Sequence, residues 1–328
     1  MRAVVFDQPG SPEVMRIGEV SIPTPGPKEV LVKVHATALN RADTLQRRGF
    51  YPPPPGASDI LGLEMAGIVV AVGESVTGWE KGDRIMGLLS GGGYASFVVI
   101  HEDMALPIPE GMDFAQAAAI PEAFLTAFQA IVLIARFQKG ESILIHAGAS
   151  GVGTSAIQIA RELLPQKIFV TASAPKHDIC KALGADVLID YKKSDFSRII
   201  RDKSDDSGVD VIIDFLGASY LAKNLDAIAT DGRIVLLALM GGAKADDVNL
   251  GHVLRKRVQI TGSTLRARSL EYKIDLSKRF AAFALPRFNS GAIKPIIDSV
   301  LDWSEVVEAH RYMEANKNKG KIVLTIDS

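Results

Sequence analysis

A glycine-rich turn between a mostly apolar run and an amphipathic stretch constrains the fold of this chain most strongly. The apolar run covers residues 143–147, and residues 151–156 read G-V-G-T-S-A, which matches the pattern G-x-G-x-x-A. Glycines allow the backbone to approach a pyrophosphate, and the N–H groups at a helix start favour its negative charge. A strand, this turn and a helix in that order predict a dinucleotide-binding βαβ unit. We expect four residues around the turn to contact the pyrophosphate: Ser150, Gly151, Val152 and Gly153.

Strand and helix patterns alternate after residue 140. The expected strands cover residues 143–147, 168–172, 187–190, 209–214, 234–238 and 258–262. Helical patterns, such as those at 176–183 and 218–229, separate most of them. This alternation predicts an α/β fold with a doubly wound parallel sheet of the Rossmann type, which binds ligands at the carboxyl ends of its strands. We therefore expect further cofactor contacts after the later strands, at Leu216, Gly217, Leu239, Met240, Gly241, Thr264, Leu265 and Arg266.

The rest of the chain has a different pattern. Residues 1–121 contain short strands, expected at 30–34, 67–73 and 94–100, which proline and glycine turns separate. Many short strands with such turns predict a β-rich, barrel-like domain. Residues 272–285 have a helical pattern that Pro286 is expected to end, and residues 321–326 form an expected final strand. Because this last part does not continue the βα order, we expect residues 1–121 and 266–328 to form a catalytic domain around a Rossmann cofactor domain of residues 122–265.

Composition and charge exclude several classes of partner. The formal net charge of −1 gives no electrostatic reason to expect nucleic acid or an anionic membrane as a partner. A single cysteine, Cys180, excludes an internal disulfide and a thiolate-rich metal site. The chain has no secretion-signal pattern and no apolar run of the length that a membrane span needs. We therefore expect a cytoplasmic protein that binds neither nucleic acid nor membrane.

The end of the second Rossmann strand indicates which dinucleotide binds. NAD-specific folds place an acidic side chain about 20 residues past the glycines, where it binds the ribose 2′-hydroxyl. Residues 171–176 read T-A-S-A-P-K and contain no carboxylate. Ser173 can donate a hydrogen bond to a 2′-phosphate, Lys176 can supply positive charge, and Tyr191 can pack over the same region. The pattern favours NADPH, although a solvated lysine at a helix start is an equally ordinary interpretation of Lys176 taken alone.

Several further motifs occur in a fixed order along the whole chain. They cover residues 38–43 (A-L-N-R-A-D), 49–56, 61–64 (L-G-L-E), 118–123 (A-A-I-P-E-A), 146–153, 189–193 (I-D-Y-K-K) and 314–321. With these motifs the chain resembles the zeta-crystallin-like quinone oxidoreductases of the medium-chain dehydrogenase/reductase superfamily, and among them the stress-inducible members that a tumour suppressor induces. The resemblance implies a GroES-like catalytic domain built from both chain ends, NADPH as cofactor, a quinone as acceptor and a homodimer.

The same resemblance bears on metal binding, because the superfamily also contains zinc alcohol dehydrogenases. Catalytic zinc needs three protein ligands that converge on one open site. Asn40 stands where the family has its first cysteine ligand, and Leu63 stands where the family has a histidine. We therefore expect no metal. Without a Lewis acid, a quinone or an activated alkene is a better hydride acceptor than a simple carbonyl, because it delocalises the charge that develops.

Four residues are candidates for contact with the acceptor or for its orientation. Tyr51 lies beside the stiff run Pro52–Pro55, Asn40 carries an amide donor, Asp43 follows in the same motif, and Thr126 resembles a family residue near the nicotinamide. Asn40 and Thr126 are also expected to contact the cofactor. Ordinary roles stay open for each of the four: a loop tyrosine, a turn asparagine, a helix cap and a packed helix threonine. Asn318 is expected to reach the cofactor, or else to form a polar turn.

The sequence therefore predicts an NADPH-dependent, zinc-independent quinone oxidoreductase. An NADPH-dependent reductase of α,β-unsaturated carbonyls has the same electronic demand and could use the same residues. A cofactor-binding structural or regulatory protein with little turnover is the alternative outside the enzymes.

Overall fold

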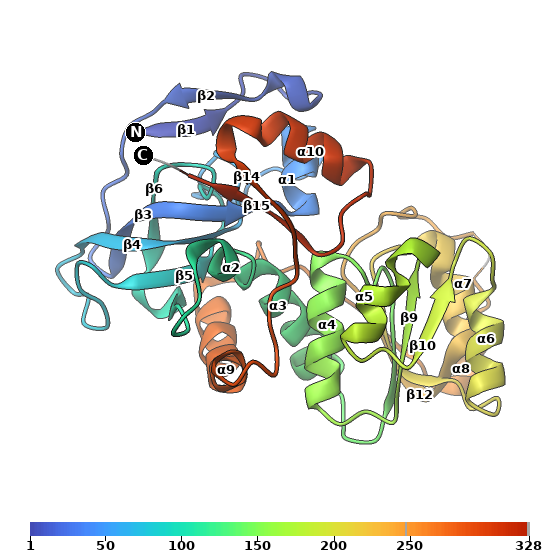
Figure 1. Ribbon diagram of the computed structural model, residues 1–328. Helices are drawn as coiled ribbons and strands as arrows, with labels where there is room; N and C mark the ends of the chain where they lie inside the picture. The colour runs from blue at the N-terminus through green and yellow to red at the C-terminus, as the bar shows by residue number, and fades with distance from the viewer. Residues whose placement is uncertain (247, 327–328) are drawn as a thin grey trace. The chain divides into compact units, whose positions relative to one another are not determined.

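The computed structural model describes residues 1–246 and 248–326. The chain divides into two compact units, which Figure 1 shows coloured along the sequence. Unit 1 comprises Met1–Leu125 and Leu265–Ser328, and unit 2 comprises Thr126–Thr264. No helix in the described parts of the chain is both long and apolar enough to cross a membrane.

Unit 2 is built on a six-stranded sheet in the order β10-β9-β8-β11-β12-β13, with every neighbouring pair parallel. Its strands are β8 (Ser142–Ile145), β9 (Lys167–Ala172), β10 (Val187–Asp190), β11 (Val209–Asp214), β12 (Ile228–Leu236) and β13 (Gln259–Gly262). Its helices are α4 (Gly151–Glu162), α5 (His177–Ala182), α6 (Phe196–Lys203), α7 (Ala218–Ala227) and α8 (Leu250–Lys256). The central strands β8 and β11 are buried on both faces, as parallel strands between helices must be. The chain reverses its direction of sheet growth between these two strands, which makes their carboxyl ends the expected ligand crevice.

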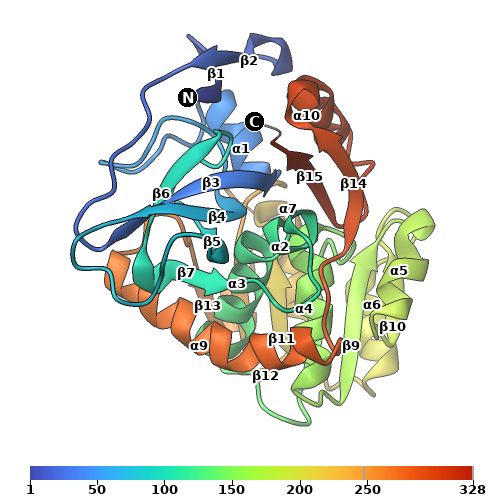
Figure 2. The same ribbon diagram turned by 60° about the vertical axis from the view of Figure 1, so that its left-hand side comes forward.

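Unit 1 is built on a mixed sheet in the order β14-β15-β3-β4-β5-β7, with β6 paired to β3 (Figure 2). Its strands are β3 (Glu29–Ala38), β4 (Glu64–Val72), β5 (Arg84–Leu88), β6 (Phe97–His101), β7 (Ala105–Pro107), β14 (Ile297–Asp302) and β15 (Lys321–Thr325), and β1 (Arg2–Val5) pairs with β2 (Arg16–Glu19). Its helices are α1 (Arg41–Arg47), α2 (Phe114–Ala118), α9 (Leu270–Asn289) and α10 (Val306–Glu314), and α3 (Pro121–Phe128) begins in this unit. The final strand β15 pairs with β3, so both chain ends build one sheet. The predicted fold class is confirmed.

Two predictions about single elements were wrong. The helix expected to end before Pro286 continues through it, because α9 spans Leu270–Asn289. Phe288, in its last turn, packs edge-on against Phe124 at 5.1 Å between ring centroids, and this packing outweighs the backbone bond that proline cannot donate. The strand expected at 94–100 begins only at Phe97, because the buried Tyr94 belongs to a turn.

Candidate functional site

The glycine turn after β8 packs too closely to accept larger residues. Ala147 has a φ of 47°, and a Cβ atom added to Gly148 would lie 2.1 Å from Val170 Cγ1. A Cβ added to Gly153 would lie 2.4 Å from the Ala147 carbonyl oxygen. The Ser150 hydroxyl caps helix α4 by accepting the Gly153 N–H at 3.0 Å. The first N–H groups of a helix have no acceptor within the helix, so those of Gly151 and Val152 are suited to a phosphate. This turn fits the pyrophosphate of a dinucleotide.

Two further turns at the carboxyl edge of the same sheet are bonded to each other. After β11, Asp214 accepts the Leu216 N–H at 2.6 Å, and Gly217 adopts a φ of 71°. The Leu216 carbonyl oxygen accepts the Gly241 N–H from the turn after β12 at 2.7 Å. The structure thus brings together five of the residues predicted after these strands, Leu216, Gly217, Leu239, Met240 and Gly241. Thr264 follows β13 at the same edge.

Ser173, Lys176 and Tyr191 follow two neighbouring strands of this sheet. Ser173 comes directly after β9 and Tyr191 directly after β10, and these strands pair in parallel, with Ala172 opposite Asp190. Ser173 and Lys176 are partly exposed, and Tyr191 is 46% exposed. The Asp190 carboxylate accepts the Lys192 N–H in its own turn. The three predicted side chains therefore lie at adjoining strand ends.

The other predicted residues are divided between the two units. Thr126 belongs to unit 2, and its buried hydroxyl has no hydrogen-bond partner among the described residues. Leu265 is buried in unit 1. Asn318 Nδ2 donates to the Gly320 carbonyl oxygen at 2.7 Å, in the turn before β15, which is the polar-turn role left open from the sequence.

Asn40 belongs to a buried ionic cluster in unit 1. The Lys321 ammonium donates to Glu64 Oε1 at 2.7 Å, to Asn40 Oδ1 at 2.7 Å and to the Leu39 carbonyl oxygen at 2.9 Å. Asn40 Nδ2 in turn donates to Glu64 Oε1 at 2.7 Å. Glu64 is fully buried and Lys321 is 4% exposed. The register of the sheet explains why Lys321, Asn40 and Glu64 lie together. Strands β15 and β4 flank β3 on opposite sides, with Val323 opposite Ala38 and Ala66 opposite Ala36.

Asp43 holds the backbone of this cluster in place. Its carboxylate accepts the Asn40 N–H at 2.7 Å and the Gly62 N–H at 3.1 Å, and the Tyr94 hydroxyl donates to it at 3.3 Å. Burial raises the pKa of Asp43 to about 6, against the lowering effect of these N–H bonds. Asp43 is therefore a helix cap, as one interpretation of the sequence allowed, but a buried cap rather than a solvated one. In the described residues, no group of three or more His, Cys, Asp or Glu side chains is arranged to hold a metal.

Sequence reasoning missed Glu122, the second residue of α3. Its N–H donates to Glu64 Oε2 at 2.8 Å. Burial, with the nearby charge of Glu64, raises the pKa of Glu122 to about 8, so this carboxyl is largely protonated at neutral pH. Its place in the motif A-A-I-P-E-A was the signal in the sequence, and no role was predicted for it there.

Tyr51 and Arg266 lie beside Glu122 in the same unit. The Arg266 guanidinium stacks on the Tyr51 ring with its carbon 5.4 Å from the ring centroid. Burial and the charge of Glu122 raise the pKa of the Tyr51 hydroxyl, and burial lowers the pKa of Arg266. Arg266 Nε donates to the Ser90 carbonyl oxygen at 2.8 Å, whereas its buried Nη2 has no partner among the described residues. A phenol, a neutral carboxyl and a guanidinium can each donate a hydrogen bond to an electron-rich oxygen.

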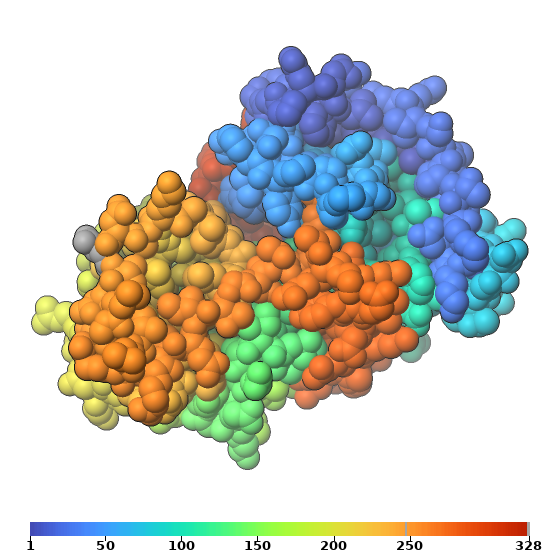
Figure 3. Space-filling view, turned by 180° about the vertical axis from the view of Figure 1, so that it is seen from behind, coloured from blue at the N-terminus to red at the C-terminus, as the bar shows by residue number. Residues whose placement is uncertain are grey.

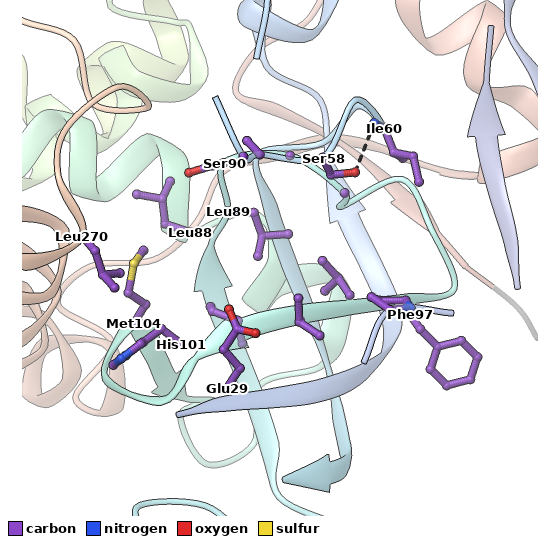
Figure 4. A pocket seen from close by; sticks show the side chains of 18 of the residues that line it. Glu29, Ser58, Ile60, Leu88, Leu89, Ser90, Phe97, His101, Met104 and Leu270 are labelled. Carbon is purple, nitrogen blue, oxygen red and sulfur yellow. Dashed lines mark hydrogen bonds between the residues drawn. The ribbon is translucent and has the colours of Figure 1, made fainter. Parts of the chain in front are cut away.

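Ser90 also lines a cavity of about 380 Å³ in unit 1 (Figure 4). Leu88, Leu89, Met104 and Leu270 give this cavity apolar walls. Lys273, which is largely buried, donates to Ser90 Oγ at 2.9 Å from the same lining. Ser90 therefore lines this cavity and also holds the Arg266 guanidinium through its carbonyl oxygen.

Comparisons with known proteins decide the family. Residues 26–110 match the alcohol dehydrogenase GroES-like domain, and residues 183–324 match the zinc-binding dehydrogenase family. The synaptic vesicle membrane protein VAT-1 homolog of Rattus norvegicus is 34% identical over 92% of this chain and 78% of that protein. The quinone oxidoreductase of Homo sapiens is 31% identical over 99% of this chain and 98% of that protein. The chain belongs to the medium-chain dehydrogenase/reductase superfamily.

Solved structures of this superfamily agree with the assignment. A quinone oxidoreductase of Pseudomonas syringae pv. Tomato DC3000 is 31% identical, with a TM-score of 0.86 over 99% of both chains. An NAD-dependent alcohol dehydrogenase is 32% identical, with a TM-score of 0.88 over 100% of both chains. The CurK enoyl reductase is 29% identical, with a TM-score of 0.89 over 99% of both chains. The predicted resemblance to quinone oxidoreductases is confirmed, and the chain is an oxidoreductase of a superfamily that uses a nicotinamide cofactor.

Proposed function

We propose that this medium-chain dehydrogenase/reductase is an NADPH-dependent, zinc-independent quinone oxidoreductase. The observation that carries the proposal is the ammonium of Lys321, which Asn40 and Glu64 hold beside the positions of the superfamily's cysteine and histidine zinc ligands. An amide and a leucine at these positions are poor zinc ligands, and a buried ammonium repels a second cation. Acceptors that delocalise negative charge by themselves suit such a site.

Three hydrogen-bond donors near this cluster, Tyr51, Glu122 and Arg266, support the supply of a proton to the reduced acceptor. The bound nicotinamide would supply the hydride, and the hydroquinone monoanion that results must take up one proton. We assign that proton to the Glu122 carboxyl, whose pKa of about 8 keeps it protonated at neutral pH. Tyr51 and Arg266 would orient the acceptor oxygen by hydrogen bonds, and solvent would return the proton to Glu122. Asn40 and Asp43 would keep this segment in position.

The preference for NADPH rests on the end of β9. Ser173 and Lys176 offer a hydroxyl and an ammonium to a 2′-phosphate, and residues 171–176 contain no carboxylate that would repel it. Thr126, with its unpaired buried hydroxyl, and Ser150 support contacts along the rest of the dinucleotide.

Anaerobic oxidation of NADPH with a panel of quinones and enals tests the proposal. We expect kcat/KM to be highest for quinones, with a carbonyl-activated alkene as the second choice. The likeness to CurK enoyl reductase favours that second function, and higher kcat/KM for enals would establish it instead. Tight nucleotide binding without turnover of any acceptor would favour the cofactor-binding structural or regulatory protein. Semiquinone detection in the same samples separates one-electron from two-electron reduction.

The homodimer and the cytoplasmic location remain predictions. Strand β13 forms one edge of the sheet of unit 2, and its four residues are exposed. Leu250 and Leu254, on the adjacent helix α8, are 72% and 79% exposed, and this segment lies at the surface in Figure 3 (gold and orange). An unpaired edge beside exposed leucines is suited to pairing with a second copy. Light scattering after size exclusion should give twice the chain mass, and a single chain mass would contradict the dimer.

A further inference from the structure

Four buried polar side chains form a continuous hydrogen-bond chain near the carboxyl ends of the strands in unit 2. His146 Nδ1 lies 2.9 Å from Thr171 Oγ1, and His146 Nε2 lies 2.8 Å from Asn224 Oδ1. Asn224 Nδ2 donates to Asp214 Oδ2 at 3.0 Å. All four side chains are at most 1% exposed. They come from the ends of β8, β9 and β11 and from α7, which the sheet order brings together.

The direction of every bond in this chain follows from its two ends. An ionised Asp214 has no proton to donate, so it accepts the N–H groups of Leu216 and Gly217 and also accepts from the Asn224 amide nitrogen. The Asn224 amide oxygen then faces His146, and only a protonated Nε2 can donate to it. Burial lowers the pKa of His146 to about 4, so the ring is neutral at pH 7 and its Nδ1 accepts from the Thr171 hydroxyl. A single tautomer satisfies all four groups.

At Asp214 this chain of hydrogen bonds reaches the turn at residues 216–217, which is expected to contact the cofactor. Asp214 holds the Leu216 and Gly217 N–H groups at 2.6 Å and 3.2 Å, which fixes Gly217 at a positive φ. His146 is also the first residue after β8, immediately before the glycine turn. The rings of Phe196 and Tyr220 pack edge-on against His146 at 4.8 Å and 4.9 Å between centroids and prevent it from rotating away.

We propose that His146, as its Nε2-protonated tautomer, is a positioning residue for the nucleotide. Through Asn224 it orients Asp214, and Asp214 in turn sets the turn at residues 216–217 in the conformation that receives the cofactor. The inference rests on the cofactor site proposed above and not on the identity of the acceptor.

Two substitutions of the same residue separate this role from general stabilisation. In His146→Gln, the amide nitrogen can occupy the place of Nε2 and donate to Asn224. In His146→Asn, the shorter amide reaches only the place of Nδ1, so the bond to Asn224 is lost. Ser142→Ala is the matched control, because it removes a buried hydrogen bond to Asp210 at the opposite end of strand β8.

The readout is the dissociation constant of NADPH and of NADH, measured by fluorescence without any acceptor. We expect His146→Asn to weaken both nucleotides about tenfold, His146→Gln to stay within threefold of the unchanged protein, and Ser142→Ala to lower only the melting temperature. Unchanged affinity in His146→Asn would overturn the positioning role. Failure of the unchanged protein to bind either nucleotide would overturn the proposed cofactor site instead.

The tautomer is tested separately by nitrogen-15 NMR of the protein labelled at histidine. The His146 signals, assigned by their loss in His146→Gln, should show a protonated Nε2 and an unprotonated Nδ1 from pH 6 to 8. A protonated Nδ1 would overturn the proposed direction of these hydrogen bonds, whatever affinity for the nucleotide is measured.

Discussion

Replacement of Lys321 by methionine should reveal how strongly the buried cluster of unit 1 depends on its cation. Methionine keeps most of the length of the side chain but removes three hydrogen bonds, to Glu64, Asn40 and the Leu39 carbonyl. Among the described residues, the Asn40 amide and the Glu122 N–H would then be the only donors left to the buried Glu64 carboxylate. Removal of one partner from a buried ion pair costs about 3–5 kcal/mol, and we expect a loss of this size in the free energy of unfolding.

Urea unfolding at pH 7.5, followed by circular dichroism, measures this loss. The double variant Glu64→Gln/Lys321→Met should recover most of the stability, because it leaves no uncompensated charge. Arg257→Met is the control, since it breaks the exposed ion pair to Asp231 and should have little effect. A loss below about 1 kcal/mol for Lys321→Met, or a double variant no more stable than the single one, would refute the reasoning.

Four further results are expected. Tyr51→Phe should lower quinone kcat at least about tenfold and leave NADPH affinity unchanged, as steady-state and binding assays would show, because it removes one donor to the acceptor oxygen. Lys176→Ala should weaken NADPH about tenfold or more and NADH hardly at all, and equal losses would contradict the 2′-phosphate assignment. Glu122→Gln should lower kcat about a hundredfold and abolish the fall in rate that we expect above pH 8, whereas an unchanged pH profile would exclude Glu122 as the acid. Folding lowers the pKa of His146 from 6.5 to about 4, so neutral His146 contributes about 3 kcal/mol to the free energy of unfolding above pH 6.5. This contribution is lost as the pH falls through 4, and acid unfolding curves of His146→Gln should lack that pH dependence.

The positions of the Rossmann strands along the sequence could be predicted because local pattern determines them. An apolar run, a glycine turn and an amphipathic helix lie within about 20 residues of each other. Five of the strands end and begin within two residues of their expected bounds, whereas β12 begins six residues before the expected 234. The length of α9 could not be predicted, because the packing of Phe288 against Phe124, far apart in sequence, decides whether the helix continues past Pro286.

The composition of the candidate site was only partly predictable for the same reason. Lys321 meets Asn40 across 281 residues and Glu64 across 257, and only the register of β15, β3 and β4 brings them together. Glu122 carries no pattern that distinguishes it from a solvated acid in the first turn of a helix. Its raised pKa arises from burial beside Glu64, which the sequence does not display.

The internal ammonium of Lys321 also limits how this protein could be redesigned to bind a metal. A zinc site engineered here would require a cysteine at Asn40, a histidine at Leu63 and the loss of Lys321, since a divalent ion and the ammonium would repel each other. Loss of Lys321 alone would leave the buried Glu64 carboxylate without its cation and would lower stability before any metal could bind. These substitutions would therefore have to be made together for the cluster to become a zinc site.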